Sequence, residues 1–479
     1  MMKNNKQYNI LLKIVLTSVL CIIAAGTIIS QEYKVELYVS KQPGSEIITG
    51  SVRGDKFTAA DTIEHETDTI RFEIPRDAHT GLYRVILGQT VYAQVMHEPP
   101  QKVDFIFNKE DILLRTDFEH PFDSLYVVSS LENKVWHKFM VQDKKYNREL
   151  NDLVRQINYF QKAKDDKYYT DKKKKEIISR YNEIQKKHEA LIKSVSKKYP
   201  RLYATKMIKM HRTPFLDGNL SKEKRDSVYN AGFFKVLDFS DPELINSDVY
   251  TDRIFEYIMK NVPADEQREK QVEKLINAVD RIIDNTSSNE EVNDFIVDYL
   301  LRGFEKLGFT DVLDHIADRY TPKVPCTSDN KTTFRRRLDF LKMRKDTVVP
   351  DFKLADINGD SISLNDVNSK YKLIVFWASW CPHCEQLLPD IYQWYLNRSH
   401  DVEVIAISVD TDKNAWKEFV NSRGYDWINC NEPEGWDGKV ATEYNVYATP
   451  TMFLVDNENR IIAKPLSFND LLDSIIGLK

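Results

Sequence analysis

The feature that most restricts the fold of this 479-residue chain is an apolar run followed at once by two closely spaced cysteines. The run Lys372–Trp377 predicts a fully buried parallel strand, and Pro382 to about Leu396 predicts the helix that follows it. Successive strand and helix patterns are typical of right-handed βαβ units, whose chemistry lies at the carboxyl ends of the strands. Cys381 and Cys384 fall at such an end.

The same alternation of strands and helices continues to the end of the chain. It predicts strands at Val402–Val409 and Thr451–Val455, with a helix between them that ends at Gly424. Ahead of these elements, Asn358-Gly359 predicts a short hairpin with a type I′ turn. We therefore expect an α/β domain over residues 346–479.

The chain before residue 346 has two other patterns. Short alternating runs separated by turn residues predict an antiparallel β-domain over residues 31–120. Helical periodicity then extends over residues 121–345, beginning where Ser129 and Glu132 have the spacing of a capping box. The expected fold class is therefore multidomain, with an antiparallel β N-terminal domain, an α-helical middle domain and a C-terminal α/β domain.

Composition and charge exclude some classes of partner. The chain is 42% hydrophobic and 29% charged, with a net charge of -5, which is typical of a globular protein and argues against nucleic acid as a partner. The segment Lys162–Lys198 is richer in Lys and Arg than in Asp and Glu. Its interleaved acids favour an ordinary solvated helix face over a basic docking surface.

Residues 1–30 have the layout of a secretory signal, since Lys3 and Lys6 precede an apolar stretch. We expect either a signal peptide or, because the stretch is nearly 20 residues long, an N-terminal membrane anchor. Either predicts a protein of the periplasm or cell envelope, where disulfides persist.

The pair Cys381-Pro382-His383-Cys384 predicts thiol chemistry. A cysteine at the start of a helix lies beside free N–H groups and the positive end of the helix dipole, so Cys381 is expected to be the attacking thiolate. Cys384, one turn further on, is expected to resolve the mixed disulfide. His383 is expected to stabilise the Cys381 thiolate, the alternative being an exposed histidine without a partner.

The other cysteines have several interpretations. Half of a zinc site is disfavoured because there is no second Cys-x-x-Cys pair, so no metal or other cofactor is expected. Cys326 and Cys430 could form a structural disulfide, act as a redox relay or remain buried and free, and we favour the last.

The residues Phe376 to Cys384, Pro389 and Thr449-Pro450-Thr451 closely resemble the thioredoxin superfamily. Val349-Pro350-Asp351-Phe352 and the Asn358-Gly359 turn resemble its TlpA/ResA branch of envelope-facing proteins, which handle disulfides or cytochrome c biogenesis. The resemblance covers residues 346–479. Weaker likeness in Gly81-Leu82-Tyr83 and Ser130-Leu131-Glu132-Asn133 links the rest to N-terminal extensions of TlpA-like proteins.

The resemblance implies a thioredoxin-like fold with Pro450 as a cis-proline beside the cysteines. The Thr449 backbone would pair with an extended substrate peptide, and Trp380 would shield the disulfide. Pro382 would lie at the same substrate-binding surface. Two positions depart from the family pattern, since Val375 and Leu387 stand where relatives have acidic residues. Proton transfer to Cys384 would then depend on water or Glu385.

These observations predict a thiol–disulfide oxidoreductase that acts on protein thiols and disulfides, with a membrane electron donor or acceptor as a further partner. The direction of electron flow is open, because Cys-Pro-His-Cys favours oxidation whereas most of the branch are reductants. One alternative is a thiol peroxidase of the peroxiredoxin kind, although Ala378 and Ile374 stand where such enzymes have Ser or Thr and Pro. Another is an envelope scaffold with an accessory thioredoxin domain.

Overall fold

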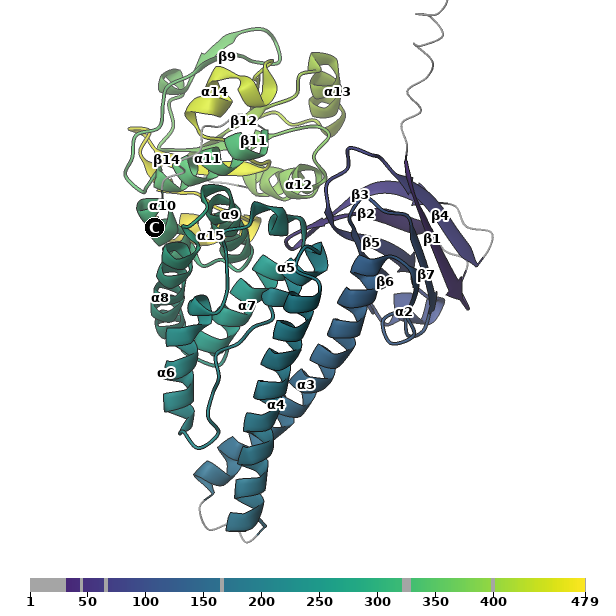
Figure 1. Ribbon diagram of the computed structural model, residues 1–479. Helices are drawn as coiled ribbons and strands as arrows, with labels where there is room; N and C mark the ends of the chain where they lie inside the picture. The colour runs from purple at the N-terminus through teal and green to yellow at the C-terminus, as the bar shows by residue number, and fades with distance from the viewer. Residues whose placement is uncertain are drawn as a thin grey trace, which may run out of the picture. The chain divides into compact units, whose positions relative to one another are not determined.

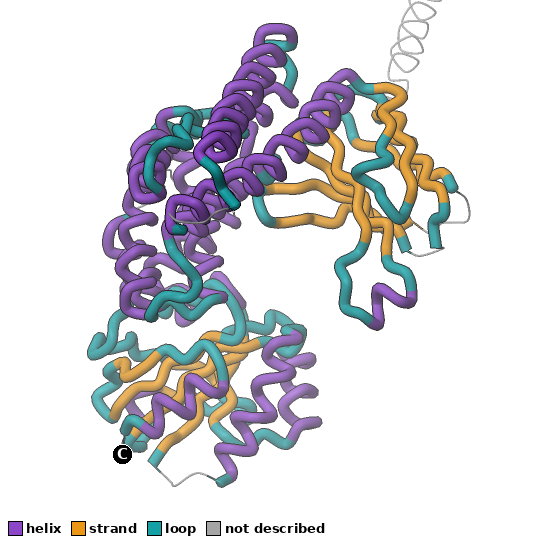
Figure 2. The backbone as a smooth tube through the Cα atoms, turned by 90° about the horizontal axis from the view of Figure 1, so that it is seen from below, coloured by secondary structure: helices purple, strands orange, loops and turns teal. Residues whose placement is uncertain are grey.

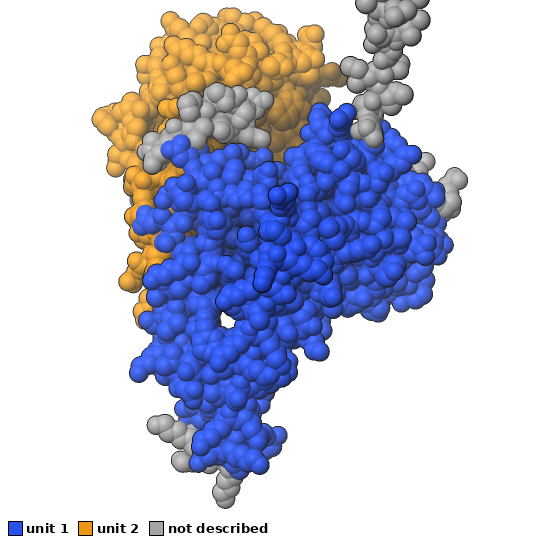
Figure 3. Space-filling model, in the orientation of Figure 1, with its two compact units in different colours: residues 1–260, 284–296 blue, residues 261–283, 297–479 orange. Residues whose placement is uncertain are grey.

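The structure is a computed structural model that describes residues 32–43, 46–63, 68–163, 168–320, 329–397 and 401–478, without the side chains of 329–332. It has two compact units, residues 1–260 with 284–296 and residues 261–283 with 297–479 (Figure 3). The predicted signal or anchor segment and Cys326 lie outside the described residues. Among the helices described, none is long and apolar enough to cross a membrane.

The first unit begins with two four-stranded sheets that share one apolar core (Figure 1). Their orders are β4-β1-β7-β8 and β3-β2-β5-β6. Alternate side chains such as Leu37, Val85 and Phe105 are buried between them, as the period of two requires. The strands, with one short helix, are β1 (Tyr33–Ser40), β2 (Ile47–Arg53), β3 (Lys56–Ile63), β4 (Thr69–Ile74), β5 (Gly81–Gly88), α2 (Val91–Val95), β6 (Gln101–Phe107), β7 (Ile112–Asp117) and β8 (Tyr126–Ser129).

One strand pair corrects the predicted antiparallel domain. β1 pairs antiparallel with β4 but parallel with β7, where Val35 lies opposite Ile112. Alternating polarity tells which face of a strand is buried and says nothing about the direction of its neighbour. Parallel neighbours need a long crossover, and β2 to β6 lie in the connection between β1 and β7.

The first long helix, α3 (Leu131–Lys162), begins one residue later than predicted. Its N-cap is Ser130, whose Oγ accepts a hydrogen bond from the Asn133 backbone N–H at 3.1 Å. The predicted capping box of Ser129 and Glu132 is therefore wrong. Ser130 has φ of 100°, so the chain turns sharply between β8 and α3 and moves the cap by one position.

Glu132 instead joins α3 to α5 (Tyr203–Lys209). Its buried carboxylate accepts hydrogen bonds from the backbone N–H groups of Tyr203 at 3.0 Å and Ala204 at 2.7 Å. These N–H groups have no acceptor within α5. Leu202 is the N-cap residue of α5 and makes no side-chain hydrogen bond to them, so the Glu132 carboxylate takes that role.

The lysine-rich segment forms α4 (Asp171–Lys198), which packs beside α3 (Figure 1). Its lysines are mostly exposed, and Lys187 and Lys193 pair with acids four residues earlier, Glu183 at 2.6 Å and Glu189 at 3.4 Å. This is the arrangement expected of a solvated helix face. The later helices are α6 (Lys222–Gly232), η1 (Phe233–Lys235), η2 (Pro242–Asn246), α7 (Val249–Asn261), α8 (Arg268–Thr286), α9 (Glu290–Lys306), α10 (Thr310–Arg319) and α11 (Asp329–Lys342).

The second unit contains a five-stranded sheet in the order β13-β12-β11-β14-β15. The central strand β11 runs parallel to β12 and antiparallel to β14, and Figure 2 shows the strands running between the helices of this unit. Its elements are β9 (Lys353–Ala355), β10 (Ser361–Ser363), η3 (Leu364–Asp366), β11 (Tyr371–Trp377), α12 (Pro382–Leu396), β12 (Val402–Ser408), α13 (Lys413–Arg423), β13 (Ile428–Asn431), η4 (Gly435–Asp437), α14 (Lys439–Glu443), β14 (Thr451–Asp456), β15 (Ile461–Ala463) and α15 (Phe468–Ile476).

The hairpin between β9 and β10 is present, but its turn is not type I′. Gly359 has φ of 97°, whereas Asn358 does not have the positive φ that a type I′ turn requires. The Gly359 backbone N–H donates to the Asp356 carbonyl at 3.1 Å, so the turn centres on Ile357 and Asn358 with Gly359 after it. Asp356 Oδ1 accepts from the backbone N–H of Asn358, which holds this longer loop.

Candidate redox site

The two cysteines lie where β11 ends and α12 begins. Six of the seven residues of β11 are buried, which fixes this strand in the middle of the sheet. Cys381 is the N-cap of α12, and Pro382 occupies the first turn, where its missing N–H is not needed. Cys381 is 5% exposed and Cys384 is fully buried. The strand-to-helix junction predicted from the sequence therefore brings the pair together at the carboxyl end of β11.

Hydrogen bonds at the helix start surround the Cys381 sulfur. The Cys384 backbone N–H lies 3.3 Å from Sγ of Cys381 and donates to it, and Sγ also lies 3.4 Å from the Thr449 carbonyl oxygen. The first contact uses a backbone donor that the helix leaves free. The second brings the cysteine against a segment 68 residues further along the chain.

The two thiols titrate in opposite directions. Burial raises the pKa of Cys381, but hydrogen bonds with the side chains of Cys384 and Thr449 and with the backbone N–H groups of Cys384 and His383 outweigh it and lower that pKa overall. Burial is the largest cause of the strongly raised pKa of Cys384, and hydrogen bonding to Cys381 adds to it. At neutral pH Cys381 is thus the better nucleophile and Cys384 holds its proton.

The remaining predicted site residues lie around the pair. The Thr449–Pro450 peptide is cis, directly before β14. Trp380 is 58% exposed, and its ring centroid lies 6.4 Å from that of Trp436. Pro382 and His383 are exposed, and the described interactions include no hydrogen bond from the His383 imidazole to the sulfur.

The acidic residue that directly follows the motif, Glu385, is paired with an arginine. Glu385 is exposed and forms an ion pair with Arg423 at 2.8 Å. Val375 is fully buried in β11, and Leu387 is partly buried against the core. The groups that shift the pKa of Cys384 include no carboxylate.

Asp410 is a residue of this site that the sequence analysis missed. Its carboxylate accepts hydrogen bonds from Ser379, at 2.9 Å from the backbone N–H and 2.8 Å from the hydroxyl, and from the Ser408 hydroxyl at 2.6 Å. Asp410 is buried and fixes the turn two residues before Cys381. Its position just after the buried strand β12 was the available signal.

A second missed group holds the segment before the cis-proline. The Tyr447 hydroxyl donates to the carboxylate of Glu305 on α9, and Arg337 of α11 lies 4.9 Å above the Tyr447 ring. Phe340 of α11 packs edge-on against the same ring at 5.4 Å. We call these four residues the tyrosine clamp. All belong to the second compact unit, so helices outside the five-stranded sheet help to hold the cis-proline segment.

Cys430, the other cysteine that the structure describes, has different surroundings from the pair. Cys430 is a fully buried free thiol on β13, and burial, followed by the charge of Asp356, raises its pKa to about 12. Within the described residues no group of three or more His, Cys, Asp or Glu side chains is arranged to hold a metal ion.

Comparison with known proteins places this segment among redox proteins. Residues 346–464 match the model of the AhpC/TSA family. A Bacillus thuringiensis protein named thiol-disulfide oxidoreductase ResA is 32% identical over 123 residues, 25% of this chain and 69% of the relative. The protein of that name from Bacillus subtilis is 32% identical over 114 residues, and the chain spans 62% of its length.

Solved structures similar to this chain include the thioredoxin domain of a thiol-disulfide oxidoreductase from Bacteroides vulgatus. It is 26% identical, with a TM-score of 0.27, and the match covers 28% of this chain and 97% of that one. A thioredoxin-like protein from Bacteroides caccae is 18% identical with a TM-score of 0.36, covering 55% of this chain and 95% of that chain.

Proposed function

The chain belongs to the TlpA/ResA branch of the thioredoxin superfamily, and we propose that it is an exported thiol–disulfide oxidoreductase that exchanges disulfides with proteins through Cys381 and Cys384. The observation that carries this proposal is the position of Cys381 at the N-terminus of α12, where its sulfur accepts the Cys384 backbone N–H at 3.3 Å. That position favours a thiolate on one cysteine of a pair and leaves the other protonated.

In the reducing direction the exchange takes two steps. The Cys381 thiolate attacks one sulfur of a substrate disulfide, so a mixed disulfide forms and the other substrate sulfur leaves as a thiolate. Cys384 then loses its proton and attacks the Cys381 sulfur, which releases the second substrate thiolate and closes the Cys381–Cys384 disulfide. The two electrons gained by the substrate come from the pair, and the reverse sequence oxidises a substrate dithiol.

The loss of the Cys384 proton needs an acceptor. Glu385 is engaged with Arg423, and no carboxylate contributes to the pKa shift of Cys384. We propose that water accepts this proton while the mixed disulfide is still in place, before Cys384 attacks the Cys381 sulfur.

In this proposal the substrate binds to the exposed residues around the cysteine pair. An extended peptide would lie along the Thr449 backbone, whose carbonyl oxygen lies 3.4 Å from Cys381 Sγ, and the exposed Trp380 ring would contact it. Pro382 and His383, which are also exposed, would belong to the same binding surface. A membrane protein is the expected source or acceptor of electrons, because residues 1–30 suggest export.

The name of the matching family model raises a peroxidase as a second candidate. A peroxidatic cysteine is expected to have Ser or Thr three positions earlier and Pro seven positions earlier, and here those positions hold Ala378 and Ile374. Both are buried apolar side chains that offer no hydrogen bond to a peroxide.

Turnover of a model protein disulfide, with dithiothreitol as reductant, tests the proposal. We expect the wild-type chain to be active and Cys381→Ser to lose turnover, with Cys430→Ser as the matched control that retains it. Equal rates from wild type and Cys381→Ser would favour a scaffold role. Hydrogen peroxide turnover that exceeds disulfide turnover would favour the peroxidase.

A further inference from the structure

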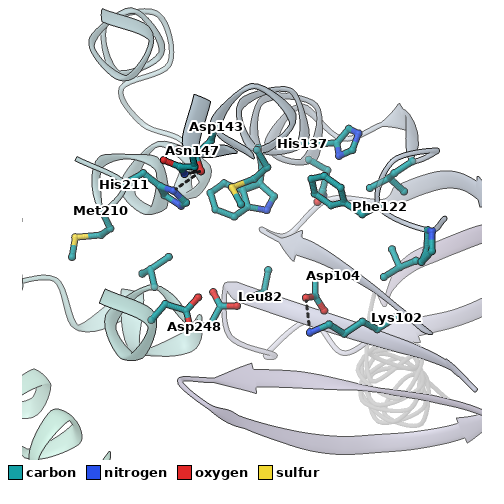
Figure 4. Close-up of a pocket in the computed structure, with 18 of the residues that line it drawn as sticks. Leu82, Lys102, Asp104, Phe122, His137, Asp143, Asn147, Met210, His211 and Asp248 are labelled. Atoms are coloured by element: carbon teal, nitrogen blue, oxygen red, sulfur yellow. Dashed lines mark hydrogen bonds and ion pairs between the residues drawn. The ribbon is translucent and has the colours of Figure 1, made fainter. Parts of the chain in front are cut away.

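A second candidate site lies in the first compact unit, where a cavity of about 470 Å³ opens beside β5, β6, α3 and α7. Every residue that lines it belongs to that unit. Figure 4 shows His211 and Phe122 on one side of the cavity and Asp248, Leu82 and Asp104 on the other. The volume of this cavity is in the range of small-molecule sites, and its lining combines apolar side chains with many polar and charged ones.

Several acidic side chains of the cavity already have partners. Arg84 donates to both oxygens of Asp104, at 2.6 and 2.9 Å, and Lys102 lies 3.6 Å from the same carboxylate. Arg253 pairs with Glu256. The basic side chains that line the cavity are therefore occupied by these acids, which disfavours an anionic ligand.

Asp248 and Asp252 differ from the other acids. They lie four residues apart at the start of α7, and no ion pair or side-chain hydrogen bond with another residue is described for either carboxylate. Burial raises the pKa of Asp248 to about 7, and the charges of Asp252 and Asp104 add to this shift. Asp252 is exposed, and burial of its carboxylate causes a rise in its pKa that the charges of His211, Lys102, Arg253 and Arg84 partly offset. A positive group between the two carboxylates would offset the repulsion that the Asp252 charge exerts on Asp248.

Aromatic rings form the opposite side. Trp136 and Phe122 both line the cavity and are only partly buried. The Phe122 ring already contacts a cation, since Lys144 Nζ lies 4.4 Å from its centroid. The Trp136 ring packs on Phe139 at 6.4 Å and on His211 at 5.7 Å, so it is held in place. Aromatic surface opposite carboxylates suits a ligand with a positive group at one end and an apolar part at the other.

His211 adds a fixed polar group to this wall. Its Nδ1 lies 3.3 Å from the carboxylate of Asp143, which is also bonded to the buried His188 at 2.6 Å. Asp143 therefore orients the His211 ring toward the cavity (Figure 4). The described residues contain no metal-binding group here, so an organic cation fits better than a metal ion.

We propose that this cavity binds a small primary amine, whose ammonium group lies between Asp248 and Asp252 and whose apolar part contacts Trp136 and Phe122. The ammonium would donate charge-assisted hydrogen bonds to both carboxylates. The apolar part would be removed from water against the aromatic rings. This site does not depend on the redox chemistry of Cys381.

Calorimetric titration of the full-length protein with n-pentylamine tests the proposal at pH 8, with n-pentanol and pentanoate as probes of equal chain length. We expect saturable binding of the amine and at least about tenfold weaker binding of the alcohol and the acid, a difference of about 1.4 kcal/mol. Equal binding of the three compounds, or no saturation by the amine, would overturn the proposal.

Isosteric variants locate the ligand. Asp248→Asn and Asp252→Asn should each weaken amine binding by about tenfold, while Asp171→Asn, on the exposed first turn of α4, should leave it unchanged. Disulfide turnover should be unaffected in all three, and thermal unfolding followed by far-UV circular dichroism reports whether the first compact unit of each has folded. Unchanged amine affinity in both cavity variants would place the ligand elsewhere and contradict the proposal.

Discussion

At the scale of single residues, one turn of helix separates two cysteines with opposite properties. Cys381 receives backbone N–H groups at the start of α12, whereas Cys384 is enclosed by the core. The motif and its position after a buried strand were sufficient to predict this asymmetry, because helix termini leave their donors free in any sequence.

The pH dependence of alkylation should reveal this difference. The lowered pKa of Cys381 means that its thiolate, and so its reactivity, is present at lower pH than for an ordinary thiol and is lost as pH falls through that pKa. Among the three cysteines that the structure describes, we expect iodoacetamide at pH 7 to modify Cys381 fastest in the reduced protein. Mass spectrometry that finds Cys384 or Cys430 modified at a similar rate would contradict the prediction.

His383 was predicted to stabilise the Cys381 thiolate. Because backbone N–H groups, Cys384 and Thr449 lower the pKa of Cys381 and the His383 side chain is exposed, we expect His383→Gly to raise that pKa by less than about one unit. Thiolate absorbance during a pH titration measures it. A rise of two units or more would show that the imidazole acts on the sulfur.

The role of Asp410 could not be predicted with the same ease. A carboxylate after a buried strand is common, and Ser379 reaches Asp410 only when β11 and β12 pair in their register. The local sequence therefore marked the cysteines but not the side chain that fixes the turn before them.

At the scale of secondary structure elements, the tyrosine clamp joins α9 and α11 to the cis-proline segment. Glu305 and Tyr447 are 142 residues apart, and no local pattern pairs them. The predicted strands and helices of the second unit agree closely with β11, α12 and β14, because long buried runs and helix caps are local signals. The turn at Asn358 differed because Asp356 hydrogen bonds compete with the two-residue turn.

Removing one hydroxyl group tests the clamp. We expect Tyr447→Phe to reduce disulfide turnover by about threefold to tenfold, or up to about 1.4 kcal/mol in the barrier, because the segment beside Thr449 loses its bond to Glu305. The pKa of Cys381 should not change.

The control for this variant is Tyr395→Phe, which removes a Tyr hydroxyl bond of 2.9 Å to Glu403 in the same unit. Turnover should then remain near that of the wild type. Equal losses in both variants would mean that the clamp has no specific role at the cis-proline segment.

Phe340 tests whether α11 is part of the core of the second unit. Its side chain is 4% exposed within the same apolar cluster as Phe376 and Phe453. Phe340→Ala should lower the free energy of unfolding by about 3–5 kcal/mol, since it removes a buried ring and leaves a cavity.

Chemical denaturation followed by fluorescence measures this loss. The matched variant Phe255→Ala removes a ring that is 55% exposed and should change the free energy of unfolding by less than about 0.5 kcal/mol. A loss below about 1 kcal/mol for Phe340→Ala would show that α11 contributes little to this core.

At the scale of the whole molecule, the chain combines a redox pair in one compact unit with a separate cavity in the other. The sequence was informative about the first because a Cys-x-x-Cys pair carries its chemistry in four adjacent residues. It was silent about the second, whose Asp248, Trp136 and Phe122 come from distant segments. Function that depends on convergence of such segments is visible only once the chain has folded.

Trapping of mixed disulfides tests most directly whether Cys381 attacks the substrate and Cys384 resolves the mixed disulfide. Cys384→Ser and Cys381→Ser variants of the full chain would be incubated with oxidised protein substrates and analysed by non-reducing gel electrophoresis and mass spectrometry. We expect stable adducts through Cys381 in Cys384→Ser and few or none in Cys381→Ser. Adducts of equal yield in Cys381→Ser, linked through Cys384, would contradict it.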